Sequence, residues 1–283
     1  MRPSDEKTVL VVGASSGIGR ACALHLTRCG YRVFGTTRRS AGDVEAALRQ
    51  EVASPDRLNI ITMDVDDVAS VKAAIDEVEE QAGRIDAVVN CAGFGMGGSI
   101  EDTADDEAKA IFETNFFGTL RVCCAVLPIM RKQRSGTIVN ISSIGGRIAL
   151  PFQGLYSATK FAVEGLTESL GMEVQRFGIR VVLVEPGDFA TGFTDNRRST
   201  RNASENEAYA DVCRTALEVV ERDERGGASP EAIGRLVARI LAARSPRLRY
   251  TIGAAFQRVA VLLRIVLPAR LFGWGLKKYY HLG

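Results

Sequence analysis

The beginning of the chain limits its choice of folds more than any other segment does. A short apolar run, Thr8-Val9-Leu10-Val11-Val12, passes into the turn Gly13-Ala14-Ser15-Ser16-Gly17-Ile18-Gly19, and residues 20–28 suit a helix. Glycines in such a turn let the backbone bend tightly and let a pyrophosphate approach, while the helix N-terminus supplies amide donors. A plain strand-to-helix connection could use the same residues, but the position directly after a first strand favours a dinucleotide site.

Short apolar runs alternate with stretches of helical periodicity along the rest of the chain. The expected strands lie near 8–12, 32–36, 58–63, 85–90, 136–142, 179–185 and 248–252. The expected helices lie near 17–29, 43–52, 67–81, 105–133, 155–177 and 230–243. This alternation predicts an α/β protein with a doubly wound parallel sheet, the Rossmann fold.

The length of 283 residues fits one large domain of this kind. We expect that domain over residues 1–253, with a substrate-side insertion over 192–229 and a separate extension over 254–283. The insertion is polar and rich in turns, with a short helix expected over 208–221. A long insertion beside a compact sheet is usually a functional lid or a mobile loop.

The cysteines and the N-terminus indicate the compartment. The six cysteines lie in apolar surroundings and form no CxxC pair or Cys/His cluster, so we expect a reducing compartment and no metal site. The first residues carry charges of both signs and precede an apolar run too short for a signal peptide. No run approaches the roughly 18 apolar residues of a membrane span. These features favour a cytoplasmic protein.

Further motifs follow the glycine-rich turn in a fixed order. Asn90-Cys91-Ala92-Gly93 ends the fourth expected strand, and Asn115 lies in the next helix. Ser143 ends the fifth strand, Tyr156-Ser157-Ala158-Thr159-Lys160 opens a helix, and Pro186-Gly187 follows the sixth strand. From residue 8 to about 195 the chain therefore resembles the short-chain dehydrogenase/reductase family. Val12 departs from the family, which commonly has threonine there, and we expect a looser turn contact with cofactor binding retained.

The chemistry of Tyr156 and Lys160 follows from their spacing. Residues i and i+4 of a helix face the same way, and an ammonium near a phenol lowers the phenol pKa. Tyr156 is then a candidate general acid and base. Such a pair alone is usually a solvated surface, but Ser143 lies thirteen positions earlier at a strand end. The resemblance implies that Ser143, and not the competing Ser142, bonds the substrate oxygen, and that Asn115 holds a water linking Lys160 to solvent.

The resemblance also implies two sets of ligand contacts. Cofactor contacts are expected at Gly13, Ser15, Ser16, Gly17, Ile18, Gly19, Thr37, Arg38, Arg39, Asp64, Val65, Asn90, Ala92, Gly93, Tyr156, Lys160, Pro186, Gly187, Phe189 and Thr191. Substrate contacts are expected at Ser143, Gly145, Leu150, Tyr156 and Phe193. An N-cap role for Asp64 stays open as an alternative. Cys91 is expected to be a packed thiol, and Asp188 a solvated carboxylate.

The residue about twenty positions after the glycines bears on the choice of cofactor. An acid there bonds the ribose 2′-hydroxyl of NAD, but this chain has Thr37 followed by Arg38 and Arg39. Guanidinium groups suit a 2′-phosphate because they donate paired hydrogen bonds. NADP(H) is therefore favoured over NAD(H). Ser16, where many NADP-using members carry a basic residue, keeps open the alternative that both arginines are loop charges.

Positive charge gathers at the C-terminal end. Residues 231–283 hold ten Lys/Arg and one acid, or +9, which leaves −7 for residues 1–230. Within the extension, Phe256, Val259, Ala260, Leu263, Val266 and Leu267 are expected on one helical face, with Gln257, Arg258 and Arg264 off it. Two interpretations follow: a helix pair over the substrate cleft or a neighbouring subunit, or an interfacial helix on an anionic membrane. Nucleic acid is not an expected partner.

Together these observations predict an NADP(H)-dependent oxidoreductase acting on an alcohol or carbonyl group of an apolar substrate that is steroid-, retinoid- or lipid-like. Val184-Glu185-Pro186-Gly187, Phe193 and the basic extension resemble the 17β-hydroxysteroid and retinol dehydrogenase branch. The alternatives are an NAD-dependent alcohol dehydrogenase, a ketoacyl-thioester reductase, and a non-catalytic NADP sensor or scaffold, although a sensor has no need of all four catalytic positions. We expect a homodimer or homotetramer built on helices 105–133 and 155–177.

Overall fold

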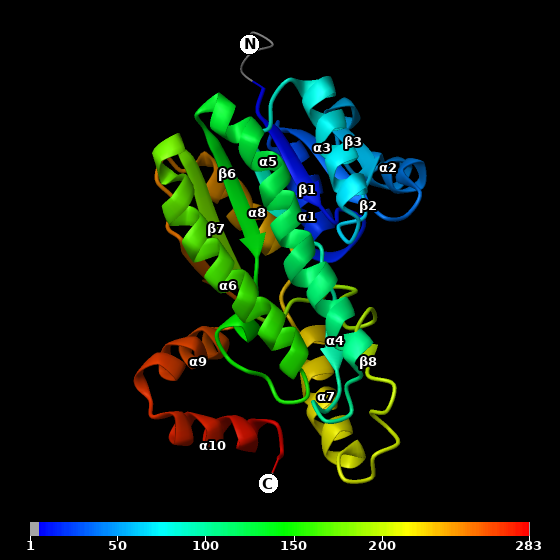
Figure 1. Cartoon of the computed structure of the whole chain (residues 1–283), viewed down its shortest axis with the longest axis vertical. Coiled ribbons are helices and arrows are strands. Elements are labelled where there is room, and N and C mark those ends of the chain that lie inside the picture. The colour runs from blue at the N-terminus through cyan, green and yellow to red at the C-terminus, as the bar shows by residue number, and fades with distance from the viewer. Residues whose placement is uncertain (1–5, 283) are drawn as a thin grey trace.

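A seven-stranded parallel sheet forms the centre of the protein, which we describe from a computed structural model covering residues 6–282. The strand order is β3-β2-β1-β4-β6-β7-β9. The strands are β1 (Thr8–Val12), β2 (Arg32–Thr37), β3 (Leu58–Thr62), β4 (Ala87–Asn90), β6 (Gly136–Ile141), β7 (Ile179–Pro186) and β9 (Arg249–Ile252). All seven expected strands are present, and the predicted doubly wound parallel sheet is confirmed (Figure 1).

Alternating residues of each strand supply two core layers, one on each face of the sheet. Val9 and Val11 pack with α1 (Gly17–Arg28) and α8 (Glu231–Ala242). Leu10 and Val12 pack on the opposite face, whose helices are α3 (Val68–Ala82), α5 (Thr119–Gln133) and α6 (Gly154–Val174). This is the consequence of the two-residue period of a strand, which sends neighbouring side chains to opposite faces. The short α2 (Ala41–Arg49) joins the first layer through Leu48.

The long helix expected over 105–133 is made of three pieces. α4 (Asp105–Phe112) and α5 are joined by the π-helical segment η3 (Glu113–Gly118), which contains Asn115. Wide π turns inside helices are frequent at functional sites because they displace a side chain from the regular helix face. By length and mean hydropathy the stretch Asp105–Gln133 is long and apolar enough to cross a membrane, but 44% of its most apolar window is buried inside the fold.

The carboxyl ends of the strands carry a second group of elements, in the lower half of Figure 1. β5 (Met96–Gly97) pairs in parallel with β8 (Arg198–Ser199), and α7 (Ala210–Arg225) follows. α9 (Ala255–Val266) and α10 (Ala269–Tyr279) form a hairpin, with Pro268 preceding α10. Single-turn segments complete the chain: η2 (Pro55–Arg57), η4 (Ile144–Gly146) and η5 (Gln175–Phe177).

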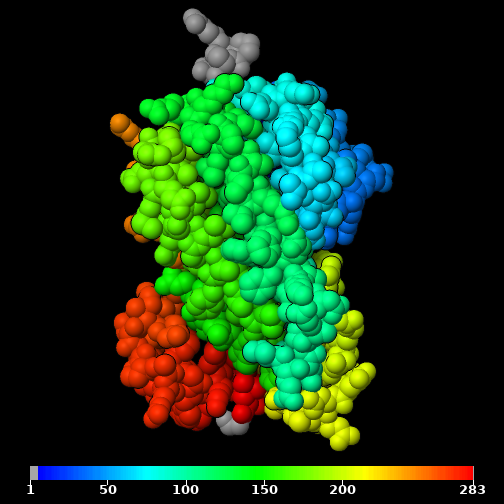
Figure 2. All heavy atoms as spheres, in the orientation of Figure 1, coloured from blue at the N-terminus to red at the C-terminus, as the bar shows by residue number. Residues whose placement is uncertain are grey.

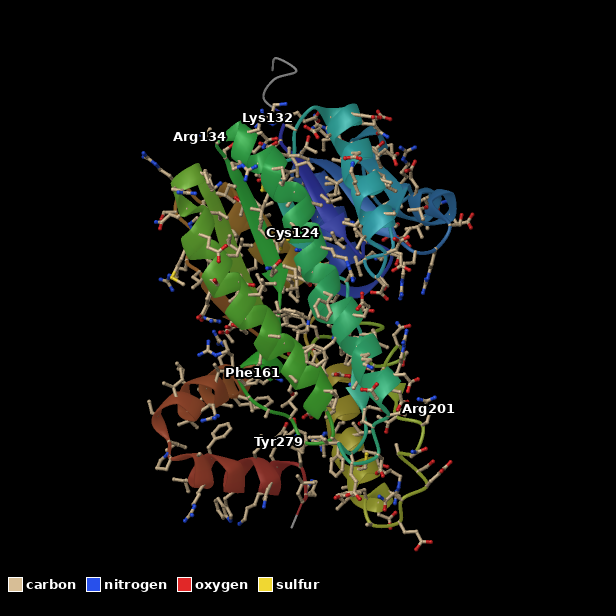
Figure 3. The ribbon with its side chains drawn as sticks, in the orientation of Figure 1. Cys124, Lys132, Arg134, Phe161, Arg201 and Tyr279 are labelled. Carbon is tan, nitrogen blue, oxygen red and sulfur yellow. The ribbon has the colours of Figure 1, made fainter. Side chains whose placement is uncertain are left out.

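One exposed face bears on the expected assembly. Figure 3 shows Cys124 of α5 and Phe161 of α6 on neighbouring helices of the same side, and both residues are exposed. Phe117 and Met172 add exposed apolar side chains to the same two helical stretches. Large apolar side chains grouped on a surface commonly mark a protein interface.

We therefore predict that two copies associate through α5 and α6. Phe161→Asp should shift the protein from dimer to monomer, because an unpaired carboxylate would be desolvated in the interface. Light scattering at micromolar concentration measures this change, with Val68→Asp on the exposed surface of α3 as the control. A wild-type protein that is already monomeric would contradict the prediction.

Candidate active site

A cleft of about 820 Å³ lies at the carboxyl ends of the strands. Its lining comes from the ends of β1, β2, β4, β6 and β7, from residues 191–224, and from α9 and α10. Its position agrees with the rule that open parallel sheets bind ligands where the strand order reverses, here between β1 and β4.

The glycine-rich turn has the backbone geometry of a phosphate cradle. Gly13 and Gly17 have φ of +80° and +53°, which favours glycine, and a Cβ at Gly19 would lie 2.1 Å from the Gly13 carbonyl oxygen. The Ser16 side chain makes no N-cap hydrogen bond, so it does not engage the first amides of α1. The residues predicted for this turn all line the cleft: Gly13, Ser15, Ser16, Gly17, Ile18 and Gly19. The turn therefore fits the pyrophosphate of a dinucleotide.

The residues expected near the adenosine ribose lie further along the cleft. Thr37, Arg38 and Arg39 line it, as do Val65, Ala92 and Gly93. The Thr37 hydroxyl accepts a hydrogen bond from the Arg39 amide at 3.0 Å. The Arg38 side chain is 53% exposed, and its Nη1 lies 3.9 Å from Asp66 Oδ2. The sequence analysis did not predict Asp66 at this site. Its carboxylate partly neutralises the positive charge of Arg38 at this end of the cleft.

Two predicted cofactor residues do not line the cleft. The Asp64 carboxylate accepts from the Asp66 amide at 3.1 Å, and Asn90 donates to Asn140 Oδ1 at 2.8 Å inside the core. The alternative role of Asp64 as an N-cap is wrong, because the N-cap of α3 is Asp67. Asn90 instead holds β4 to β6, so that Ala92 and Gly93 follow at the cleft.

Cys91 and Val12 sit where the β1 and β4 turns meet. The Val12 carbonyl accepts from the Cys91 amide at 3.1 Å, and Val12 itself is buried in the core. A hydrogen bond to Cys22 and burial together raise the pKa of the Cys91 thiol well above its usual range. The thiol therefore stays protonated, as a packed side chain does and a nucleophile does not.

The catalytic candidates meet on the other side of the cleft. Tyr156 and Lys160 come from α6, and Ser143 lies just after β6, where its Oγ accepts from the Gly145 amide at 3.0 Å. Gly145 does not line the cleft, but a Cβ there would lie 3.3 Å from both Ser143 Oγ and Tyr156 Cε1. Gly145 therefore lets the serine and the tyrosine approach each other.

The residues predicted to contact the substrate also lie close to these catalytic candidates. The Phe193 ring lies 5.6 Å from the Tyr156 ring, and Leu150 and Phe193 both line the cleft. Pro186, Gly187, Phe189 and Thr191 line the neighbouring wall. A substrate carbonyl beside Ser143 and Tyr156 would thus be flanked by apolar side chains.

Asn115 supports the turn after β4, and Lys160 bonds the end of β6. Asn115 accepts from the Phe94 amide and donates to the Phe94 carbonyl, each at 3.0 Å, and it also donates to Thr159 Oγ1. Lys160 Nζ donates to the Ile141 carbonyl at 3.0 Å. Asn115 thus orients the backbone beside Lys160, and its implied role in holding a water stays a prediction.

The expected effect of Lys160 on Tyr156 is wrong for this arrangement. Burial raises the pKa of Tyr156 to about 12, although the nearby Ser143 hydroxyl lowers it, and burial lowers the pKa of Lys160 to about 8. Lys160 Nζ lies 5.8 Å from the centre of the Tyr156 ring, and desolvation is the largest cause of the pKa shift of each group. Tyr156 is therefore protonated at neutral pH, which is the state that donates a proton to a newly formed alkoxide.

Three carboxylates line the cleft near the catalytic side chains: Asp188, Asp223 and Glu224. Glu224 accepts from Arg197 and from Thr194 Oγ1, and Asp223 accepts from Arg222 and the Tyr279 hydroxyl. Asp188 Oδ2 accepts from Gln257 Nε2 of α9. Burial, with Glu224 and Asp223 nearby, raises the pKa of Asp188 to about 7. The solvated state expected for Asp188 is wrong because α9 covers its turn.

The extension forms one wall of the cleft. Its cleft-lining residues are Phe256, Gln257, Ala260, Leu263, Leu267, Leu271, Phe272, Gly275, Leu276, Tyr279 and Tyr280. Gln257, expected off the buried face, is 5% exposed because it reaches Asp188. Figure 2 shows the hairpin packed as a block against the lower part of the body, and Figure 3 labels Tyr279, the last residue of α10.

Sequence reasoning missed Gln153. It is 2% exposed, lines the cleft, and its Nε2 has no hydrogen-bond partner among the residues that the structure describes. Its place three residues before Tyr156 was the available signal. A buried amide without a partner is costly, and a ligand atom in the cleft would satisfy it.

Fold and site together define a nicotinamide-dependent oxidoreductase with a serine, a tyrosine and a lysine at its centre. The family model for short chain dehydrogenases matches residues 7–202. The chain belongs to the short-chain dehydrogenase/reductase family, and it is an oxidoreductase of that family.

Two curated relatives extend this result. A 3-ketodihydrosphingosine reductase of Bacteroides thetaiotaomicron is 39% identical over 272 residues, which cover 96% of this chain and 97% of the relative. Estradiol 17-beta-dehydrogenase 1 of Rattus norvegicus is 34% identical over 87% of this chain and 73% of its own length.

Solved structures agree. A short-chain dehydrogenase from Streptomyces avermitilis is 35% identical, covers 96% of both chains and has a TM-score of 0.81. A family member from Burkholderia phymatum in complex with NAD is 26% identical over 97% of both chains, with a TM-score of 0.79. A structure described as ElxO with NADP bound is also 26% identical, over 87% of this chain and 97% of its own, with a TM-score of 0.71. Similar proteins thus bind either nucleotide.

Proposed function

We propose that this protein uses NADPH to reduce the ketone of a long-chain lipid that carries an amino group near its carbonyl. The observation that carries the proposal is a cleft with many apolar lining residues that also contains Asp188, which lies near Tyr156. The similarity to a 3-ketodihydrosphingosine reductase over 96% of the chain supports the same substrate class. A neutral steroid would leave the Asp188 carboxylate without a matching charge.

The chain's own residues account for nucleotide binding, for binding of the carbonyl oxygen and for proton donation. Arg38 and Arg39, which line the cleft, would hold the 2′-phosphate, and the turn at Gly13–Gly19 would hold the pyrophosphate. When bound, the nicotinamide supplies the hydride. Ser143 and Tyr156 hold the carbonyl oxygen, and Tyr156 gives its proton to the alkoxide that forms. Lys160, near Tyr156 in the same cleft wall, is positioned to bind the nicotinamide ribose.

The protonation of Tyr156 favours the reductive direction. A phenol with a pKa raised to about 12 is protonated at neutral pH and is a weaker acid than usual, but an alkoxide is a stronger base than a phenolate. Proton transfer to the alkoxide is therefore favourable. Alcohol oxidation requires the phenolate, which is scarce at neutral pH.

A substrate comparison tests the proposed function. The purified protein should oxidise NADPH with 3-ketodihydrosphingosine and react more slowly with a neutral long-chain ketone and with a 17-ketosteroid, because both lack the ammonium group. The decrease in NADPH absorbance measures the rate. A preference for the steroid, or for NADH with every carbonyl compound, would contradict the proposal.

Asp188 provides a sharper prediction about the amino group. Asp188→Asn should raise the KM for the amino ketone about tenfold, because a charge-assisted hydrogen bond is lost, while the KM for the neutral ketone stays the same. The group is ionised above its pKa of about 7, so the wild-type KM should fall as pH rises from about 6 to 8. The variant should lack this trend. An equal loss for both ketones would show that Asp188 only supports Gln257.

A further inference from the structure

The α9–α10 hairpin has two faces with different surroundings. One face lines the cleft, through residues such as Ala260, Leu263 and Leu276. The other, the outer hairpin face, consists of Arg258, Val259, Leu262, Ile265 and Val266 of α9 and Arg270, Trp274, Lys277 and Lys278 of α10, all of which are exposed. At helical spacing Arg258, Leu262 and Ile265 lie away from the cleft-lining side of α9. Val259 and Val266, which the sequence analysis expected on one face with Leu263, lie at the edge of the outer face and do not line the cleft.

The exposure of apolar side chains here is unusual for a protein surface. Leu262 is 62% exposed, Ile265 64% and Val266 72%. Among the described residues, five of the sixteen exposed large apolar side chains lie on the outer hairpin face: Val259, Leu262, Ile265, Val266 and Trp274. Apolar surface grouped in this way usually marks an interaction site.

The charges of the extension all have one sign. Residues 254–283 contain Arg258, Arg264, Arg270, Lys277 and Lys278 and no aspartate or glutamate. Lys278 Nζ lies 4.2 Å from the centre of the Trp274 ring, and the Arg264 guanidinium lies 5.9 Å from that of Phe272. Basic groups beside aromatic rings suit the boundary between lipid headgroups and acyl chains.

These features favour a lipid surface over a second copy of the chain. Two copies joined through this face would bring four positive charges against four others, whereas an anionic bilayer supplies the opposite charge. α9 has 12 residues and α10 has 11, and both are shorter than the roughly 20 residues needed to span a bilayer. The helices are therefore suited to lie on a membrane and not to cross it.

We propose that the outer hairpin face docks on anionic membranes, with Leu262, Ile265, Val266 and Trp274 in the interfacial layer and the basic side chains at the headgroups. The opposite face of the same helices lines the cleft, so an apolar substrate enters from the bilayer along the hairpin. The docking stands on the surface alone, and the route of entry rests on the proposed function.

Vesicle binding by the full-length protein tests the docking. The protein should sediment with vesicles of phosphatidylcholine and phosphatidylserine and much less with phosphatidylcholine alone, and about 1 M NaCl should weaken the binding. Trp274 is the only tryptophan of the chain, so its emission reports directly on this face. It should shift to shorter wavelength on binding and be quenched by brominated lipids.

Matched variants separate the contribution of the basic side chains to vesicle binding from that of the apolar side chains. Lys277→Glu with Lys278→Glu should lower the partition coefficient by at least about tenfold, since each basic group near an anionic surface adds substantially to binding. Lys132→Glu with Arg134→Glu, at the opposite end of the molecule in Figure 3, should leave it unchanged. Leu262→Gln with Ile265→Gln should reduce binding and the tryptophan shift, whereas the exposed Val68→Gln on α3 should not.

Two outcomes would overturn the docking proposal. One is a Trp274 emission wavelength that does not change when anionic vesicles are added. The other is an emission that changes only with protein concentration, together with outer-face variants that alter oligomeric mass, which would identify a second copy as the occupant. Turnover of a detergent-dispersed substrate tests the proposed function separately, because it needs no membrane. The route of entry is tested by the ratio of the rate with vesicle-borne substrate to the rate with dispersed substrate. If the wild-type protein binds vesicles but the outer-face variants keep the wild-type ratio, the route of entry is wrong.

Discussion

Tyr156→Phe should lower kcat for ketone reduction by about 100-fold or more, because the substituted ring cannot donate a proton to the alkoxide. The nucleotide affinity should change little, because the aromatic ring and its packing against Phe193 remain. Steady-state rates and a direct nucleotide titration measure the two effects. Tyr209→Phe, which removes a surface hydroxyl bonded to Glu101, should leave both unchanged.

The direction of the reaction adds a pH signature. With the pKa of Tyr156 raised to about 12, alcohol oxidation by the wild-type protein should increase steadily toward alkaline pH as phenolate forms. Reduction should not require alkaline pH. Turnover by a folded Tyr156→Phe variant at the wild-type rate would eliminate Tyr156 as the proton donor.

Thr37→Asp together with Arg38→Ala should weaken NADPH binding by about 10- to 100-fold and leave NADH binding equal or improved. The change removes a guanidinium that can pair with the 2′-phosphate and places a carboxylate at the cleft position where the bound ribose is expected. Asp66 lies 3.9 Å from Arg38, so the loss of the arginine also leaves that carboxylate to repel the phosphate.

Calorimetric titration of both nucleotides measures this selectivity. Arg235→Ala, which removes an exposed arginine from α8, controls for a loss of general positive charge. An equal weakening of NADPH and NADH would show that Thr37 and Arg38 do not read the 2′-phosphate.

The sheet and the centre of the site could be predicted because local pattern determines them. The apolar runs of the seven strands, the glycine turn and the spacing of Tyr156 and Lys160 are each contained in a short segment. β5 and β8 are two residues each and pair across about a hundred positions, so no local periodicity reveals them.

The features that could not be predicted depend on tertiary burial. Asp188 looks like a loop carboxylate until α9, 69 residues later, places Gln257 against it. The same contact explains the misplaced face of α9, because a polar residue occupies the buried position. The pKa of Tyr156 follows from desolvation, which the i to i+4 spacing does not contain. Asp223 and Glu224 lie in the last turn of α7, beyond the end of the short helix expected over 208–221.

Transfer of deuterium from NADPH labelled at the nicotinamide C4 hydride position tests the central claim most directly. After incubation with 3-ketodihydrosphingosine, mass spectrometry of the lipid product should find one deuterium on the carbinol carbon, and the Tyr156→Phe variant should form it about 100-fold more slowly. A lipid recovered as unlabelled ketone, from folded protein shown to bind NADPH, would contradict the account.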